Sequence, residues 1–210
     1  MCDTLTMPNE RSKLLVATGN KGKLSELKGL LADVPIELLS LSDIGSFDQV
    51  EETGATFAEN AALKARGYAL RAGILTLADD SGLEVAALDN RPGVLSARYG
   101  GADLGFDEKM LMLLDELERT SGNNRTARFV CSMAVADSAG EVVHSAEGIC
   151  NGKIAQKPRG TGGFGYDPLF IPDGFENTFG ELSNAVKQKI SHRFRAFEQI
   201  IPFLRLFYAI

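Results

Sequence analysis

The chain has 210 residues, of which 44% are hydrophobic, and this is enough for one large domain or two small lobes around a substantial core. Lysine and arginine total 22 against 28 aspartate and glutamate residues, so the formal net charge is −6. A protein that coats nucleic acid is normally basic, because neutralising many phosphates drives that binding. We therefore expect no nucleic-acid partner, and a few lysines, amide groups or a metal must hold any anionic ligand.

The cysteine and hydropathy patterns favour a reduced compartment. Cys2, Cys131 and Cys150 form no CxxC pair, and their odd number does not suggest a disulfide framework. The first ten residues lack the basic start and apolar run of a signal peptide, and no apolar segment approaches the roughly 20 residues that a membrane span needs. We expect a cytoplasmic protein without a membrane partner, with residues 1–12 as a flexible tail and residues 13–210 as a single two-lobed domain.

The first half of the chain predicts alternating strands and helices. Residues 14–17 form a short apolar run before a polar loop, and leucines at helical spacing follow until Pro35 stops the helix. Residues 36–41 predict a second strand. Thr56 and Glu59 have the capping-box spacing, so a helix should run from about residue 57 to residue 71 and end at Gly73.

The next segment, "ILTLADDSGLEV", is an apolar run of strand length that meets two carboxylates, Asp79 and Asp80, where a turn could begin. Residues 105–120 predict a helix with Asp107 as a possible cap and one buried face, consisting of Met110, Leu111, Leu114 and Leu117. Residues 127–154 predict a hairpin around a polar turn at residues 137–140.

Glycine and proline punctuate residues 157–175, which predicts a long structured loop. The last segment predicts a helix that is capped by Ser191, with Phe194, Phe197, Ile201 and Leu204 near helical spacing. Pro202 should bend or end that helix. The order of elements predicts an α/β fold with one domain.

The loop from Thr18 to Lys23 is either an anion site or a solvated turn. "ATGNKGKLSEL" lacks the first glycine of a Walker-type phosphate loop and places Leu24 where the metal-binding hydroxyl should be. A polar loop at a helix start nevertheless offers free backbone N–H groups and the positive end of the helix dipole.

Two acidic pairs, Glu51 with Glu52 and Asp79 with Asp80, lie at the expected edges of elements. Carboxylates of this kind suit Mg²⁺, which takes one or two of them and completes its shell with water and substrate phosphates. Each pair taken alone is equally compatible with a solvated surface or a turn.

Two later segments offer groups that could recognise a nucleobase. In "GTGGFGYDPLF" the glycines allow close backbone approach, and Phe164 and Tyr166 supply flat faces, although aromatic side chains more commonly pack into a core. In "KQKISHR", Lys187, His192 and Arg193 could donate to a base carbonyl or phosphate, or could form a solvated helix cap.

Together these segments resemble the inosine triphosphate pyrophosphatase family, and the bacterial dITP/XTP pyrophosphatases in particular. The motifs are "ATGNKGKLSEL", "EETGATFAENAALKAR", "ADDSGLEV", "PGVLSARYGG", "GTGGFGYDPLF" and "ISHR", in family order from about residue 14 to residue 197. The resemblance implies a mixed elongated central sheet flanked by helices, two lobes with the active cleft between them, and a homodimer. It also implies Mg²⁺-dependent hydrolysis of noncanonical purine nucleoside triphosphates (ITP, dITP and XTP) to the monophosphate and pyrophosphate.

Carried over by position, the resemblance assigns roles to individual residues. Asp80 would be the proton acceptor, with Lys64 reaching the phosphates, and Glu51 or Glu52 would bind Mg²⁺ together with Asp80. The substrate-binding residues would be Thr18, Gly19, Asn20, Lys21, Gly22, Lys23, Ser81, Phe164, Gly165, Tyr166, Asp167, Lys187, His192 and Arg193. Two alternatives stay open: a nucleotide-binding regulator without turnover, and a pyrophosphatase for other modified nucleotides.

Overall fold

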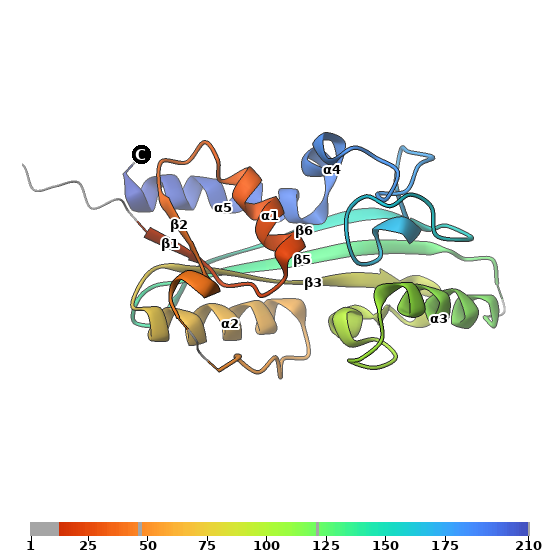
Figure 1. The fold of residues 1–210 in the computed structure, drawn as a ribbon, viewed down its shortest axis with the longest axis horizontal. Coiled ribbons are helices and arrows are strands. Elements are labelled where there is room, and N and C mark those ends of the chain that lie inside the picture. Colours follow the sequence, from red (N-terminus) through yellow and green to blue (C-terminus); the bar gives the residue numbers. More distant parts are fainter. Residues whose placement is uncertain (1–12, 46–47, 121, 210) are drawn as a thin grey trace, which may run out of the picture.

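The computed structural model describes residues 13–45, 48–120 and 122–209, so the expected tail at residues 1–12 lies outside the described residues. A single seven-stranded mixed sheet runs through the molecule in the order β2-β1-β3-β5-β6-β7, and β4 pairs with β3 (Figure 1). The strands are β1 (Lys13–Val16), β2 (Glu37–Ser40), β3 (Thr76–Val85), β4 (Arg91–Pro92), β5 (Thr126–Ala136), β6 (Val142–Ile154) and β7 (Phe170–Pro172).

In the described part of the chain, five α-helices flank the sheet: α1 (Lys21–Leu30), α2 (Phe57–Ala72), α3 (Phe106–Glu118), α4 (Asn184–Ile190) and α5 (His192–Tyr208). Short 3-10 helices include η1 (Leu41–Asp43), η2 (Ala86–Leu88), η3 (Gly93–Arg98) and η4 (Asp167–Leu169). β1 is parallel to β2 and β3, whereas β3, β5, β6 and β7 form antiparallel neighbours. Figure 1 shows α1, α4 and α5 above the sheet and α2 and α3 below it.

The long strand β3 connects the two ends of the molecule, and its twist changes which helix covers each face. Leu77 belongs to a core with residues of α1 and α5, whereas Leu83 belongs to a second core with residues of α3. Side chains two residues apart share a face, so Leu77 and Leu83 lie on the same face of β3 and Ala78, which packs on α2, lies on the other. α2 and α3 therefore contact opposite faces of a strongly twisted sheet, although both lie below it in Figure 1.

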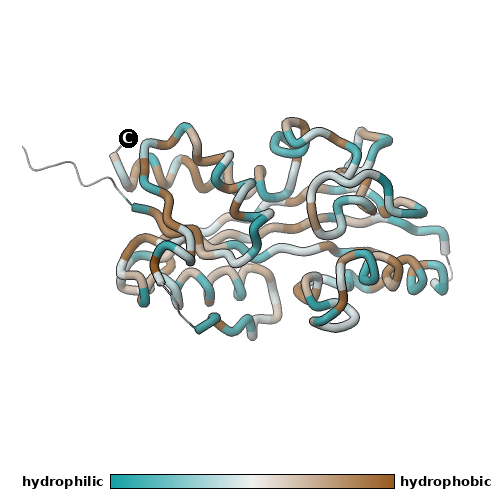
Figure 2. Tube along the Cα trace, viewed as in Figure 1, coloured by the Kyte–Doolittle hydropathy of each residue, from teal (hydrophilic) through white to brown (hydrophobic). Residues whose placement is uncertain are grey.

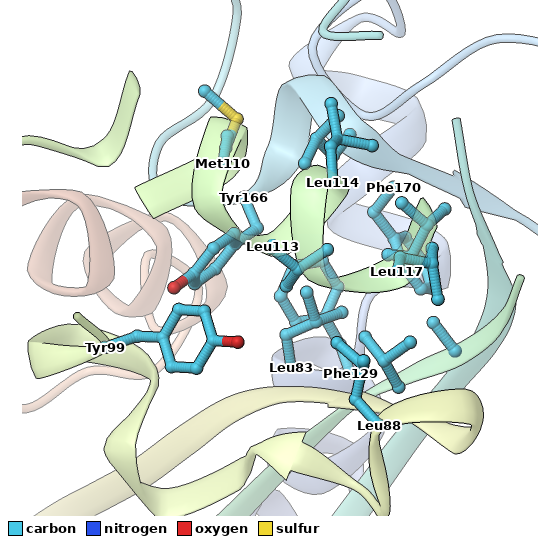
Figure 3. Close-up of a cluster of buried hydrophobic side chains, with 14 of the residues drawn as sticks. Leu83, Leu88, Tyr99, Met110, Leu113, Leu114, Leu117, Phe129, Tyr166 and Phe170 are labelled. Atoms are coloured by element: carbon cyan, nitrogen blue, oxygen red, sulfur yellow. The ribbon is translucent and has the colours of Figure 1, made fainter. Parts of the chain in front are cut away.

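The core is divided between two lobes. In the first lobe, α1 and α5 cover one face of the sheet and α2 covers the other. In the second lobe, Leu113 and Leu117 of α3 pack towards Leu83 and Phe129 of the sheet (Figure 3). The hydrophobic segments follow the strands and the helices that cover them, while the peripheral loops are mainly hydrophilic (Figure 2).

Several predicted elements are confirmed. The Thr56 side chain accepts a hydrogen bond from the Glu59 N–H at the start of α2, and Gly73 ends that helix with a left-handed backbone. β5 and β6 form the expected hairpin, and Ser191 caps α5. The mixed α/β fold class is also correct.

Three local predictions are wrong. Asp79 and Asp80 do not begin a turn, because β5 pairs with β3 along its whole length. Gly105, not Asp107, caps α3. The buried stripe of α3 contains Leu113 instead of Leu111, which is 60% exposed.

The helix α5 does not end at Pro202 but continues through it to Tyr208. Ile200 and Leu204 are fully buried on either side of this proline, so core packing outweighs the loss of one helical hydrogen bond. The sequence patterns give no prediction for the segment that forms α4.

Candidate active site

The centre of β3 has a strand partner on one side only. The Ala17 N–H donates to the Leu77 carbonyl (2.8 Å) where β1 ends, and β4 pairs with β3 only at Glu84 and Val85. Between these points β5 pairs with one edge of β3, and the described part of the chain places no strand on the other. Both faces of β3 can therefore be reached from this open edge.

A cleft of about 590 Å³ lies along the open edge. It brings together segments from the β1–α1 loop, α2, β3, η3, the glycine-rich loop and the start of α5. Of the predicted site residues, the cleft is lined by Thr18, Gly19, Asn20, Lys23, Glu52, Lys64, Asp80, Ser81, Phe164, Gly165, Tyr166, Asp167, Lys187, His192 and Arg193.

Three predicted site residues do not line the cleft: Lys21, Gly22 and Glu51. Lys21 is the first residue of α1 and its side chain is exposed. Glu51 is exposed while its neighbour Glu52 reaches the cleft, as expected for adjacent residues of an extended segment.

The start of α1 is less open to an anion than the sequence suggested. The Asn20 side-chain oxygen accepts hydrogen bonds from the backbone N–H groups of Gly22 (2.9 Å) and Lys23 (3.1 Å). The Thr18 hydroxyl accepts one from the Asn20 N–H (3.2 Å). Since this cap satisfies two of the orphan N–H groups, the side chain of Lys23 is the principal cation on this wall.

Asp79 and Asp80 point to opposite faces of β3 and do not form one chelating pair. Asp79 Oδ2 lies 3.0 Å from Lys23 Nζ and 3.4 Å from an Arg193 guanidinium nitrogen. Burial alone would raise the pKa of Asp79, but these two cations outweigh it and hold that pKa far below its ordinary value. Asp79 is thus a permanently charged group between two cleft cations.

On the α2 face, two carboxylates converge on one ammonium group. Lys64 Nζ lies 3.1 Å from Glu52 Oε1 and 3.4 Å from Asp80 Oδ1, and Asp80 Oδ2 accepts a hydrogen bond from Asn60 (3.2 Å). Burial raises the pKa of Asp80 above its ordinary value, against the influence of Lys64. Burial alone would lower the pKa of Lys64, but Asp80, Asp79 and Glu52 outweigh it and raise that pKa.

The opposite wall is built on the glycine-rich loop. Asp167 accepts a hydrogen bond from the Phe164 N–H (2.7 Å) and forms an ion pair with Lys187 Nζ (2.5 Å). The Lys187 ammonium also lies 4.5 Å from the centre of the Phe164 ring. A Cβ atom at Gly22 would come within 2.5 Å of that ring, so the glycine allows Phe164 to lie against the first turn of α1.

His192 and Arg193 begin α5 and are both buried. The His192 ring stacks on Phe129 at 4.7 Å, and its Nδ1 atom has no hydrogen-bond partner among the described residues. Burial, followed by the positive charges of Arg193 and Lys187, lowers the pKa of His192 well below its ordinary value, so the imidazole is neutral. The cleft therefore presents a neutral ring and a fixed guanidinium on the same wall.

Sequence reasoning missed several groups that line the cleft or hold its lining residues. Glu26 pairs with Lys187 (2.7 Å) and with Arg193, and Asn60 binds Asp80. Their helical spacings were available, because Glu26 follows Lys23 by one turn and Asn60 precedes Lys64 by one turn. Gln49, Phe106 and Phe129 also line the cleft but lie outside the motifs, and Val94 and Ser96 line it from the motif "PGVLSARYGG", to which no site role was assigned.

Comparison with known proteins decides the family. The model of the Ham1 family matches residues 14–203. The chain belongs to the Ham1 family. The resemblance inferred from the motifs is thereby confirmed.

Its relatives include proteins named dITP/XTP pyrophosphatase. The one from Oceanobacillus iheyensis is 45% identical over 193 residues, which cover 91% of this chain and 98% of the relative. The one from Geobacter sulfurreducens is 47% identical over 185 residues, which cover 88% and 92%.

Solved Ham1 structures have the same fold. A HAM1 protein from Coxiella burnetii superposes with a TM-score of 0.85 at 39% identity, covering 92% of this chain and 98% of the other. A nucleoside-triphosphatase / dITP/XTP pyrophosphatase from Mycobacterium abscessus gives 0.72 at 43% identity, covering 90% and 99%.

Proposed function

We propose that this Ham1 protein hydrolyses noncanonical purine nucleoside triphosphates, namely ITP, dITP and XTP, to the monophosphate and pyrophosphate. The observation that carries this proposal is the composition of one cleft. Its lining combines lysines and a carboxylate pair with an aromatic ring, a neutral histidine and an arginine. The names of its relatives point to the same reaction.

The lysine wall suits a triphosphate. Lys23 and Lys64 would neutralise the phosphates and the charge that builds on the leaving pyrophosphate. Thr18 and Asn20 keep the loop before α1 in a fixed conformation, so Lys23 is presented to the cleft from a rigid helix start.

Glu52 and Asp80 fit a magnesium ion. Their oxygens already converge on one cation, the Lys64 ammonium, and carboxylate oxygens are ligands that Mg²⁺ prefers. Residues 13–45, 48–120 and 122–209 contain no cluster of three or more His, Cys, Asp or Glu residues, which suits an ion that completes its shell with water and phosphates. A bound Mg²⁺ would neutralise phosphate charge and polarise the reacting phosphorus.

Asp80 would accept the proton of the attacking water. The water oxygen would bond to the α-phosphorus while the bond to pyrophosphate breaks, and the proton would pass to Asp80. A general base needs to lie within roughly 3 Å of the proton that it takes, directly or through one water. Asn60 and Lys64 hold the two Asp80 oxygens and so orient the carboxylate towards the cleft.

The second wall suits a purine with a 6-carbonyl group. Arg193 is a permanent donor and the neutral His192 ring can donate from one nitrogen, so both can bind a carbonyl oxygen. Adenine would present an amino group there and leave these buried donors unpaired, which a polar site rejects strongly. Guanine shares the 6-carbonyl, and its rejection must come from other contacts.

We also propose that the protein is a cytoplasmic homodimer, in line with the family resemblance. None of the helices in the described ranges is long and apolar enough to cross a membrane.

Pyrophosphate release from ITP, dITP, XTP, ATP and GTP, measured with and without Mg²⁺, tests the proposal. We expect Mg²⁺-dependent release from the first three substrates and slow release from ATP. Equal rates for ATP and ITP would refute the base selectivity, and no release from any substrate would refute the enzymatic function. In His192→Ala and Arg193→Ala, the preference for ITP over ATP should fall.

A further inference from the structure

Asp79 is a buried carboxylate behind two cations of the cleft, and the proposed reaction gives it no role. It is only 2% exposed, and Oδ1 has no hydrogen-bond partner in the described part of the chain. All its contacts involve Oδ2, which faces Lys23, Arg193 and the Ser81 hydroxyl (3.4 Å). A charged group this deeply buried must be compensated by its neighbours.

The two cations on Asp79 come from the starts of two different helices, and both line the cleft. Lys23 lies in the first turn of α1, on the wall assigned to the triphosphate. Arg193 lies in the first turn of α5, on the wall assigned to the base. Asp79 is therefore the point where the two walls are electrostatically connected.

The two cations differ in the number of other partners that hold them. Arg193 also pairs with Glu26 and donates to the Ser81 hydroxyl (2.9 Å), so three groups fix its guanidinium. Lys23 has Asp79 as its one carboxylate partner among the described residues, and its side chain is 14% exposed. An incoming phosphate can draw Lys23 away more readily than it can draw Arg193.

We propose that Asp79 is a positioning residue that couples phosphate binding to base recognition. When a polyphosphate attracts Lys23, the Asp79 charge is left to Arg193, which is then held more firmly against Asp79 and Ser81 in its base-reading position. The inference rests on the proposed function for the identity of the two ligand parts, and it assigns Asp79 a role that is separate from the proton transfer at Asp80.

Two ligand fragments test this coupling without turnover. Calorimetry with inosine and with inorganic pyrophosphate probes the two walls separately, because the pair lacks the α-phosphate and leaves room between the fragments. In the wild-type protein, saturating pyrophosphate should tighten inosine binding by about fivefold or more, the lower range of typical allosteric couplings. Equal inosine affinities with and without pyrophosphate would overturn the proposal.

Asp79→Asn supplies the second test, and Glu84→Gln is its matched control. Glu84 lies on the same strand and pairs with Arg128 (2.6 Å), but it does not line the cleft. In Asp79→Asn the pyrophosphate effect on inosine should disappear, and the ratio of kcat/KM for ITP over ATP should fall about fivefold or more. Glu84→Gln should keep both the effect of pyrophosphate on inosine binding and the preference for ITP over ATP.

The outcomes separate this inference from the proposed function. A folded Asp79→Asn protein that keeps the coupling would show that Asp79 only stabilises the fold, which overturns the proposal. If the variant does not fold, the wild-type coupling measurement still decides. A wild-type protein that binds both fragments cooperatively but hydrolyses no nucleotide would refute the proposed function and support the coupling.

Discussion

Replacing Asp80 by asparagine removes one of the two carboxylates that converge on the Lys64 ammonium. Asparagine keeps the shape of the side chain but accepts no proton from water at neutral pH. The Asp80 oxygens serve two donors, Lys64 Nζ at 3.4 Å and Asn60 Nδ2 at 3.2 Å. An asparagine offers only one oxygen, so one of these donors must face an amide NH₂ group.

Two magnitudes follow from this geometry. Loss of a general base lowers kcat by about 10²- to 10⁴-fold, which corresponds to about 3 to 5 kcal/mol of barrier. The donor left without an acceptor costs about 1 to 3 kcal/mol of stability. We expect the lower end of this stability cost, because burial already disfavours the ionised Asp80 carboxylate. Removing that buried charge partly offsets the loss of the contact.

Steady-state pyrophosphate release and thermal unfolding measure both effects. Glu84→Gln is the control, because Glu84 lies four residues further along β3 on the same face and outside the cleft. Asp80→Asn should still bind ITP in calorimetry while turnover is lost. A turnover rate within about threefold of wild type would remove Asp80 as the proton acceptor, since a missing base costs far more.

Three further predictions concern stability. Leu113→Ala should lower the free energy of unfolding by about 2 to 5 kcal/mol in chemical denaturation. Leu111→Ala, on the exposed face of α3, should lower it by less than about 0.5 kcal/mol. Equal losses would contradict the assignment of the buried face. Gly82→Ala should lower the melting temperature clearly, because its Cβ would meet the Gly93 carbonyl at 2.5 Å, whereas Gly105→Ala meets nothing closer than 3.7 Å and should be tolerated. For Glu26, burial alone would raise the pKa, but Arg193 and Lys187 outweigh it and lower the pKa below the ordinary 4.5. The Glu26 carboxylate therefore stabilises the fold above pH 4.5, and this contribution is lost as the pH falls through the pKa of the folded state. Urea unfolding of Glu26→Gln should therefore converge with wild type as pH falls from about 6 to about 3, and a constant difference would refute the ion-pair account.

Local signals were sufficient for much of the fold. The capping box at Thr56 and Glu59 fixes the start of α2 because its two hydrogen bonds lie within one turn. The hairpin of β5 and β6 follows from two extended segments around a polar turn, whose Gly140 N–H donates to the Asp137 carbonyl. In each case the atoms that decide the structure are close in sequence.

The cleft was harder to derive because its contacts join distant segments. Glu26 and Arg193 are 167 residues apart, and no local pattern announces that they pair. Motif resemblance located Arg193, but Glu26 required the geometry. Likewise, nothing in the spacing of Glu51 and Glu52 told which of them faces the cleft.

The adjacent aspartates of β3 explain how one cleft uses two faces of a sheet. In a strand that is paired on both sides, neighbouring side chains serve separate compartments. Here β1 stops at Val16 and leaves the edge of β3 open, so the lysines that pair with Asp79 and Asp80 on opposite faces of the strand both reach one cleft. Asp79 faces Lys23, Asp80 faces Lys64, and the two lysines approach the cleft from α1 and α2. Shifting β3 by one residue would turn each carboxylate to the other face of the sheet and away from its own lysine, so the register with β5 is as important to the site as the carboxylates themselves.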